Sequence, residues 1–122
     1  MKALVTDDSR TVRTLLAEML EESGFEVAQA ADGEEALAFL SEHPDTDLVL
    51  TDWNMPKVTG LQFLTALRSD ALFAHVRVVM VTNERDFASV RSAFRAGVDD
   101  YLLKPCTRVS VREKLTALGF VM

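Results

Sequence analysis

The stretch Leu48-Val49-Leu50-Thr51-Asp52-Trp53-Asn54-Met55-Pro56 changes from apolar to polar within a few residues. Its first part has the length and composition of a strand that is buried on both faces, as strands in parallel sheets are. The Asn-Met-Pro sequence that follows favours a turn. We therefore expect Asp52 to lie where the strand ends, with its carboxylate at the rim of a sheet.

Three further apolar runs also end in polar residues. Asp7-Asp8 follow the run that contains Leu4-Val5, Thr82 follows Val78–Val81, and Lys104 follows Leu102-Leu103. If the four runs are parallel strands, their carboxyl ends meet at one rim, and three carboxylates share a small site. Such anions repel one another by about 4 kcal/mol per pair at roughly 4 Å and an effective dielectric constant of about 20. A hard divalent cation is the natural group to offset this repulsion.

Amphipathic segments separate the apolar runs. In the clearest of them, Val12, Leu15, Leu16, Met19 and Leu20 follow the spacing of a helix with one buried stripe, which should end near Ser23-Gly24. Four more helices are predicted. The second helix is opened by a capping box at residues 32–35 and continues to Leu40, and the third is marked by Leu61, Leu64 and Leu67. The fourth is marked by Phe87, Val90 and Phe94 and ended by Gly97, and the fifth is marked by Val111, Leu115 and Leu118 and capped by Thr107.

The order of elements predicts the fold class. Strand and helix alternate five times, which indicates an α/β protein with a parallel sheet, right-handed crossovers and helices on both faces. Glu26–Ala30 alternates polar and apolar residues, which suits a strand nearer the edge. In open sheets of this kind, ligands lie beyond the carboxyl ends of the strands, where the strand order reverses.

Composition narrows the class of protein further. The chain has 122 residues, which fits one domain, and a net charge of −6, which argues against nucleic acids and anionic membranes as partners. Its single cysteine, Cys106, cannot form an internal disulfide. No apolar stretch reaches the length of a membrane span, and the acidic pair at residues 7–8 interrupts what would otherwise continue as a signal peptide. We expect a cytoplasmic protein.

The polar residues and their spacing resemble those of a known family. Asp7-Asp8, Asp52, Thr82, Tyr101 and Lys104-Pro105 occur in this order, with 44 residues from Asp8 to Asp52, 30 more to Thr82 and 22 more to Lys104. This pattern resembles the receiver domain of bacterial two-component response regulators, and its spacing is similar to that of the single-domain chemotaxis regulators. The resemblance covers the whole chain. It implies a flavodoxin-like, doubly wound sheet of five parallel strands in the order 2-1-3-4-5, and one receiver domain over residues 1–122 without an effector domain.

The resemblance also implies roles for individual residues. Asp52 would be the phosphorylated aspartate, and Mg²⁺ would be bound by Asp52, by Asp8 directly, by Asp7 through water and by the backbone carbonyl of Asn54. Lys104 would pair with Asp52 and then with a phosphoryl oxygen, and the bond between Lys104 and Pro105 would be cis.

Further residues would form the switch and set the phosphoryl lifetime. Thr82 and Tyr101 would be the switch pair. Asn54 and Glu84 would flank the path of water to the phosphoryl group. Asn83 departs from the small residue that the family usually has at this position, which would affect access of the phosphodonor.

The function implied by the resemblance is signal transfer. A sensor histidine kinase or histidine phosphotransfer domain would supply the phosphoryl group, and a downstream protein would bind the surface formed by the fourth helix, fifth strand and fifth helix. Arg91 and Arg95 on the fourth helix, and Arg108, Arg112 and Lys114 on the fifth, would contribute to that surface unless they are merely solvated. We expect a monomer, with dimerisation on phosphorylation as the alternative. The chain would not be an enzyme, beyond catalysing its own phosphorylation and dephosphorylation.

Several alternatives remain open. The chain could be a phosphorelay intermediate, or a receiver excised from a larger regulator. It could be a magnesium-dependent phosphohydrolase with an aspartate nucleophile, although such enzymes usually place an acid at the position of Asn54. It could also be an interaction module that is never phosphorylated. A flavin-binding domain is disfavoured, because the acidic residues after the first strand would repel phosphate.

Overall fold

Strands and helices alternate along the chain in the computed structural model, which describes residues 1–83 and 86–120. In chain order the elements are β1 (Lys2–Thr6), α1 (Arg10–Glu22), β2 (Glu26–Ala30), α2 (Gly33–Glu42), β3 (Leu48–Thr51), α3 (Gly60–Arg68), the 3-10 turn η1 (Ala71–Phe73), β4 (Arg77–Thr82), α4 (Phe87–Ala96), β5 (Asp100–Leu103) and α5 (Arg108–Ala117). The predicted alternation of strand and helix is therefore confirmed.

The five strands form one parallel sheet in the order β2-β1-β3-β4-β5. This is the predicted doubly wound order, and β2 lies at an edge, as its alternating sequence indicated. The chain moves from β1 to β2 on one side and then crosses to β3 on the other, so the strand order reverses between β1 and β3. A ligand site is expected beyond the carboxyl ends of these two central strands.

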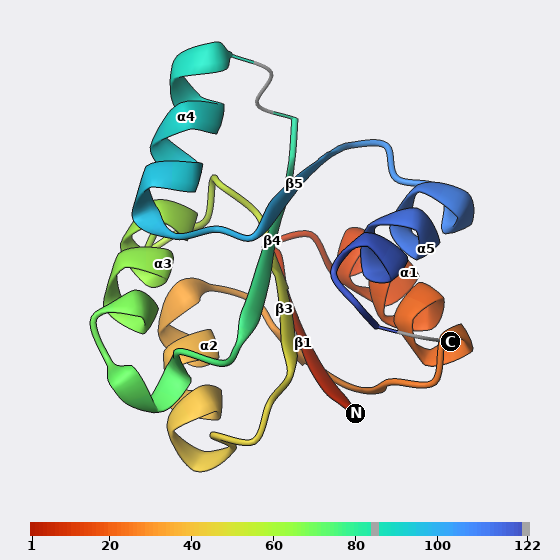
Figure 1. The fold of residues 1–122 in the computed structure, drawn as a ribbon, viewed down its shortest axis with the longest axis horizontal. Coiled ribbons are helices and arrows are strands. Elements are labelled where there is room, and N and C mark those ends of the chain that lie inside the picture. The colour runs from red at the N-terminus through yellow and green to blue at the C-terminus, as the bar shows by residue number, and fades with distance from the viewer. Residues whose placement is uncertain (84–85, 121–122) are drawn as a thin grey trace.

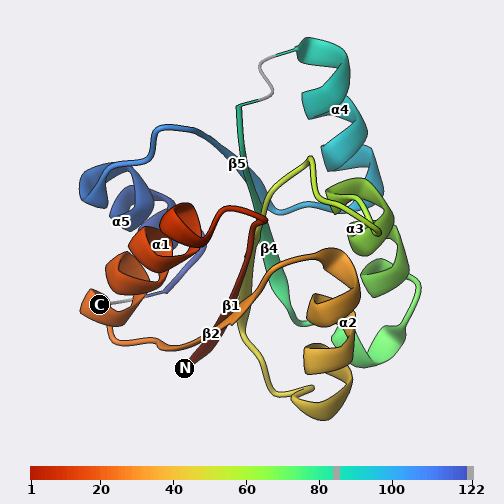
Figure 2. The same cartoon turned by 180° about the vertical axis from the view of Figure 1, so that it is seen from behind.

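The helices cover both faces of the sheet. Figures 1 and 2 show α1 and α5 on one face and α2, α3 and α4 on the other. Because successive strand residues point to opposite faces, each central strand contributes to two cores. Leu4 and Val49 belong to the core under α2 and α3, whereas Val5 and Leu50 belong to the core under α1 and α5. None of the helices in the described ranges has both the length and the apolar composition needed to cross a bilayer.

Side chains at the helix starts satisfy backbone N–H groups that have no partner within the helix. Ser9 caps α1, Asp32 caps α2, and Thr59 caps α3, where the Thr59 N–H donates in return to the Gln62 side chain. Thr107 caps α5 as predicted. The helix ends also agree with the sequence, since α1 stops before Ser23-Gly24 and α4 stops at Gly97, while α5 stops one residue before Leu118.

The large apolar residues of α4 lie mostly on its exposed side. Phe87 and Phe94, which marked this helix in the sequence, are 70% and 46% exposed. The one buried residue of α4 is the small Ala93. A helix that approaches its neighbours through a small side chain can pack closely, and its larger apolar residues are then left on the adjacent, outer face. Hydrophobic periodicity correctly predicted this helix, but it does not specify which of its sides packs against the domain.

Candidate functional site

An acidic cluster lies beyond the carboxyl ends of β1 and β3. Thr6 and Thr51 are partners in the parallel register, so Asp7 and Asp52 leave neighbouring strands at the same level. The carboxylates of Asp7, Asp8 and Asp52 each offer an oxygen, and these oxygens all lie within 4.8 Å of one another. Asp7 and Asp52 are buried and Asp8 is exposed. The three acids that the sequence placed at one rim therefore do meet.

Backbone groups orient the two buried acids. Asp7 Oδ1 accepts a hydrogen bond from the Ser9 N–H at 2.9 Å, and the Asp7 carbonyl accepts one from Arg13 Nη1 at 2.8 Å. Asp52 Oδ1 accepts a hydrogen bond from the Trp53 N–H at 2.7 Å. The two bonds to the Oδ1 atoms hold each carboxylate where the chain leaves the strand. Ser9 Oγ caps α1, and this leaves the Asp8 carboxylate to the cluster.

Lys104, at the end of β5, reaches across the site. Its Nζ lies 2.7 Å from Asp7 Oδ2 and 3.0 Å from Asp52 Oδ2. Burial lowers the pKa of the Lys104 ammonium, but its hydrogen bonds to Asp7 and Asp52 and their charges outweigh burial, so the pKa lies above its ordinary value. The ammonium is therefore charged at neutral pH and offsets part of the repulsion between the acids. The peptide bond between Lys104 and Pro105 is cis, as the family resemblance implied.

The donor set of the cluster suits a hard divalent cation. Mg²⁺ prefers carboxylate and carbonyl oxygens and retains part of its water shell. Asp7, Asp8 and Asp52 supply three carboxylates at a separation that one ion can bridge, and the exposed Asp8 leaves that side open to solvent. Asn54 is exposed in the loop that leaves β3, two residues after Asp52. Its role as a carbonyl ligand stays a prediction.

The proposed switch residues lie on the neighbouring strands. Thr82 is the last residue of β4, is 1% exposed, and its carbonyl accepts a hydrogen bond from the Lys104 N–H at 2.9 Å. Tyr101 in β5 is half-buried and packs against the core under α2 and α3. By strand alternation Thr82 points to the same face as the buried Met80, which is also the face that Tyr101 packs against. The two residues thus share one side of the sheet.

Asn83 was predicted to affect access of the phosphodonor and Glu84 to affect the phosphoryl lifetime, and the structure describes only the first of them. Asn83 directly follows β4 and is exposed, which places it beside the rim. Glu84 lies outside the described residues.

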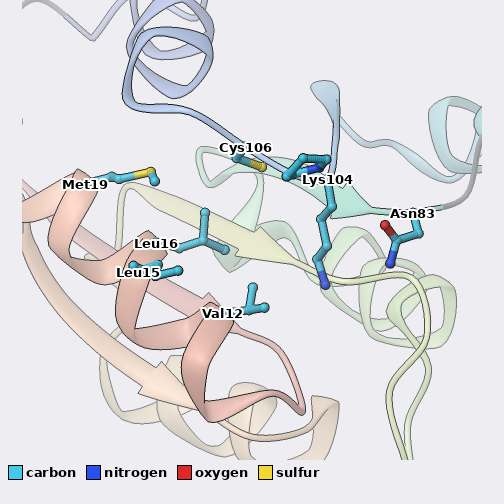
Figure 3. A pocket seen from close by; sticks show the side chains of 8 residues that line it. Val12, Leu15, Leu16, Met19, Asn83, Lys104 and Cys106 are labelled. Carbon is cyan, nitrogen blue, oxygen red and sulfur yellow. The ribbon is translucent and has the colours of Figure 1, made fainter.

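An apolar groove adjoins the acidic site. It has a volume of about 280 Å³ and is lined by Val12, Leu15, Leu16, Met19, Asn83, Lys104, Pro105 and Cys106. Figure 3 shows the α1 side chains on one side of this space and Lys104 extending along it toward the rim. Leu15, which the helical pattern assigned to the buried stripe, is 47% exposed here. Burial raises the pKa of the Cys106 thiol, against the opposing charge of Lys104.

The sequence did not predict that Lys104 pairs with Asp7 as well as with Asp52. The two residues are 97 positions apart. The position of each at a strand end indicated a shared rim, but nothing in the sequence specified which carboxylate the ammonium would contact. Two of the cations on α5 form ion pairs within the chain: Arg108 pairs with Glu22 at 2.8 Å, and Lys114 pairs with Asp100 at 3.0 Å.

An open, doubly wound parallel sheet with three carboxylates and a lysine beyond its central strands defines an α/β domain with a charged site at the point where the strand order reverses. Comparison with known proteins identifies the family. Residues 3–116 match the family described as the response regulator receiver domain, and the chain belongs to it.

Its relatives within this family include chemotaxis regulators. The chain is 41% identical over 116 residues to the chemotaxis protein CheY1 of Helicobacter pylori strain 26695, covering 94% of each chain. It is 40% identical over 116 residues to the chemotaxis protein CheY of Pseudomonas aeruginosa, covering 94% of this chain and 93% of that one. Among solved structures, Vibrio cholerae CheY4 superimposes with a TM-score of 0.89 at 31% identity, over 95% of this chain and 96% of that one. The chain is thus a CheY-like receiver domain.

Proposed function

We propose that Asp52 accepts a phosphoryl group from the phosphohistidine of a partner kinase or phosphotransfer domain. The observation that carries this proposal is the contact of one ammonium, Lys104 Nζ, with Asp52 at 3.0 Å inside a cluster of three carboxylates. A carboxylate can act as a nucleophile toward phosphorus and hold the group as an acyl phosphate. We propose the cytoplasm as the place of action.

The transfer is an in-line displacement at phosphorus. A carboxylate oxygen of Asp52 forms the new O–P bond as the P–N bond to the donor imidazole breaks. The bonding electron pair returns to the ring nitrogen, and the ring leaves as neutral imidazole when its other nitrogen carries a proton. Lys104 is placed to stabilise the negative charge on the transferred oxygens, so the chain contributes chiefly positioning and electrostatics.

Asp7, Asp8 and Asp52 would hold Mg²⁺, together with the carbonyl of Asn54. When bound, the ion would supply positive charge to the acids and to the phosphoryl oxygens. The fit of three carboxylate oxygens within 4.8 Å supports this choice of cofactor. The chain would catalyse only its own phosphorylation and dephosphorylation, at a rate that Asn54, Asn83 and Glu84 would tune.

Phosphorylation would change the surface through Thr82 and Tyr101. A hydrogen bond from the Thr82 hydroxyl to a phosphoryl oxygen would let the Tyr101 ring adopt a different position. Shifting the populations from 1:99 to 99:1 requires about 5.5 kcal/mol of differential stabilisation. One hydroxyl and one ring supply less than this, so we propose a partial shift.

The output surface would be the face formed by α4, β5 and α5. Phe87 is 70% exposed, and the guanidinium of Arg91 lies 4.8 Å from the centre of its ring. Phe94 and Leu103 add exposed apolar area on α4 and β5, and Arg95 adds a cation. Such a surface suits a protein partner that offers apolar side chains and carboxylates.

Trp53, which follows Asp52 directly, provides the test. Titration with Mg²⁺ should change its fluorescence, and subsequent addition of acetyl phosphate should give a covalent adduct visible by intact mass. The Asp52→Asn variant should form no adduct. Wild-type protein that neither responds to Mg²⁺ nor forms the adduct would refute the proposal and favour an interaction module. Sustained release of phosphate from small phosphomonoesters would instead indicate the hydrolase alternative.

A further inference from the structure

The loop between β3 and α3, residues 53–59, carries the Asn54 carbonyl and is folded tightly on itself. The Gly60 N–H donates to the Trp53 carbonyl at 2.9 Å, and the Val58 N–H donates to the Pro56 carbonyl at 2.8 Å. A Cβ atom at Gly60 would collide with the carbonyl of Asp52. The two ends of the loop are therefore fixed, and the conformation of its tip, residues 57–58, depends on the contacts that the tip makes.

The tip of the loop lies against the start of α2. A Cβ atom at Gly33 would lie 2.7 Å from the Val58 carbonyl oxygen, so this approach requires glycine. Beside it, Lys57 Nζ lies 3.6 Å from Asp32 Oδ2. The Asp32 side chain is only 7% exposed, whereas that of Lys57 is 62% exposed, so the lysine covers a nearly buried carboxylate.

Both partners of this ion pair are constrained. Asp32 Oδ1 accepts the Glu35 N–H at 2.8 Å, which fixes the carboxylate to the first turn of α2. Lys57 has a φ of 66°, in the left-handed region, and is the only non-glycine residue with positive φ in the described ranges. Backbone strain of this kind persists only where the surroundings hold it.

We propose that the ion pair between Lys57 and Asp32 is a latch that holds loop 53–59 in the conformation needed for cation binding. Lys57 and Asp32 are positioning residues, because they act through the loop that places the Asn54 carbonyl beside Asp52. This inference rests on the proposed function, since it concerns the same cation site.

The direction in which Mg²⁺ affinity changes when Lys57 is replaced distinguishes this latch from a simple electrostatic effect. A lysine near the site repels a cation, so its removal would tighten Mg²⁺ binding if charge alone mattered. If Lys57 positions the loop, its removal weakens binding instead. The Lys57→Gln variant keeps a long side chain and the same backbone restriction, and it removes only the charge. Asp32→Asn keeps a good helix cap for α2.

Two control variants account for the change in net charge. Lys2→Gln and Asp45→Asn break an ion pair of 2.7 Å at the opposite end of the sheet. We expect Lys57→Gln and Asp32→Asn to weaken Mg²⁺ affinity, measured by Trp53 fluorescence, by about two- to fivefold, the range to which a partly exposed ion pair corresponds. The double variant should bind no more weakly than either single one, because a latch that is already open cannot be opened again.

Hydrogen exchange gives a second result that does not depend on metal. In the absence of Mg²⁺, the amides of loop 53–59 should exchange faster in Lys57→Gln than in wild type, and those of β1 should not change. Wild-type protein without any Mg²⁺ response would overturn the proposed function, and the latch with it. Wild-type binding with unchanged or tighter binding in Lys57→Gln, or unchanged exchange of the loop, would overturn the latch alone.

Discussion

Replacing Asp8 by asparagine should stabilise the metal-free protein. The three carboxylates of the cluster have oxygens within 4.8 Å of one another, and Lys104 contacts Asp7 and Asp52. At this separation two unit charges repel by about 3.5 kcal/mol at an effective dielectric constant of about 20. Asp8 is exposed, so solvent screening reduces its net contribution to about 1 kcal/mol. Loss of its charge should therefore raise the free energy of unfolding by about that amount.

The same substitution should reverse its effect when Mg²⁺ is added. A ligand that binds only the folded state at ten times its Kd stabilises that state by about 1.4 kcal/mol. Wild-type protein should gain this stability. The Asp8→Asn variant should gain much less, because the neutral amide replaces one of the charged carboxylates that would bind the ion. The variant should therefore be the more stable protein without Mg²⁺, and the wild type the more stable protein with Mg²⁺.

Urea unfolding, followed by Trp53 fluorescence or circular dichroism, would measure both effects, once with a chelator and once with Mg²⁺. In thermal unfolding, 1 kcal/mol corresponds to a shift of roughly 3 to 5 °C for a domain of this size. Glu42→Gln, at the exposed end of α2, makes the same change in net charge outside the cluster and should change neither curve by much. If metal-free Asp8→Asn is less stable than wild type, the cluster is not repulsive and the reasoning is refuted.

Three further predictions concern Asp99, Lys104 and Cys106. Asp99 accepts hydrogen bonds from Arg68 Nη2 at 2.9 Å and from the Val78 N–H at 2.8 Å, so Asp99→Asn should lower the free energy of unfolding by about 1.5 to 3 kcal/mol; an unchanged urea midpoint would contradict this. Because the pKa of Lys104 is raised in the folded state, the stability from its ion pairs is complete below the ordinary lysine value of 10.5 and is lost as pH rises through the raised pKa. Unfolding curves at increasing pH should therefore show a steeper loss of stability for wild type than for Lys104→Met, and parallel losses would argue against the pairing. Because burial raises the pKa of Cys106, iodoacetamide at pH 8 should modify the thiol more slowly in the folded protein than in urea, and equal rates would show that the thiol is open to solvent.

Most of the fold could be predicted from local patterns. Strand and helix periodicities are properties of neighbouring residues, and the alternation of polar and apolar residues in Glu26–Ala30 correctly indicated an edge strand. The helix caps at Ser9 and Thr107 follow the same local logic. The strand order itself came from the family resemblance, because periodicity does not specify which strands are neighbours.

The helix faces were less predictable. The spacing of Phe87, Val90 and Phe94 correctly predicted a helix, but Phe87 and Phe94 are exposed in the structure. The residue of α4 that is buried is instead the small Ala93. Leu15 similarly is not covered but lines the groove between α1 and residues 104–106.

The sequence by itself determined that Asp7, Asp8, Asp52 and Lys104 would meet, because each follows a strand and parallel strands end at one rim. Only the tertiary structure decided how they meet. The contact of Lys104 with both buried acids, and that of Lys57 with Asp32, depend on distances between side chains that lie far apart in the chain. Such distances are set by the packing of strands and loops in three dimensions, which no local pattern of residues encodes.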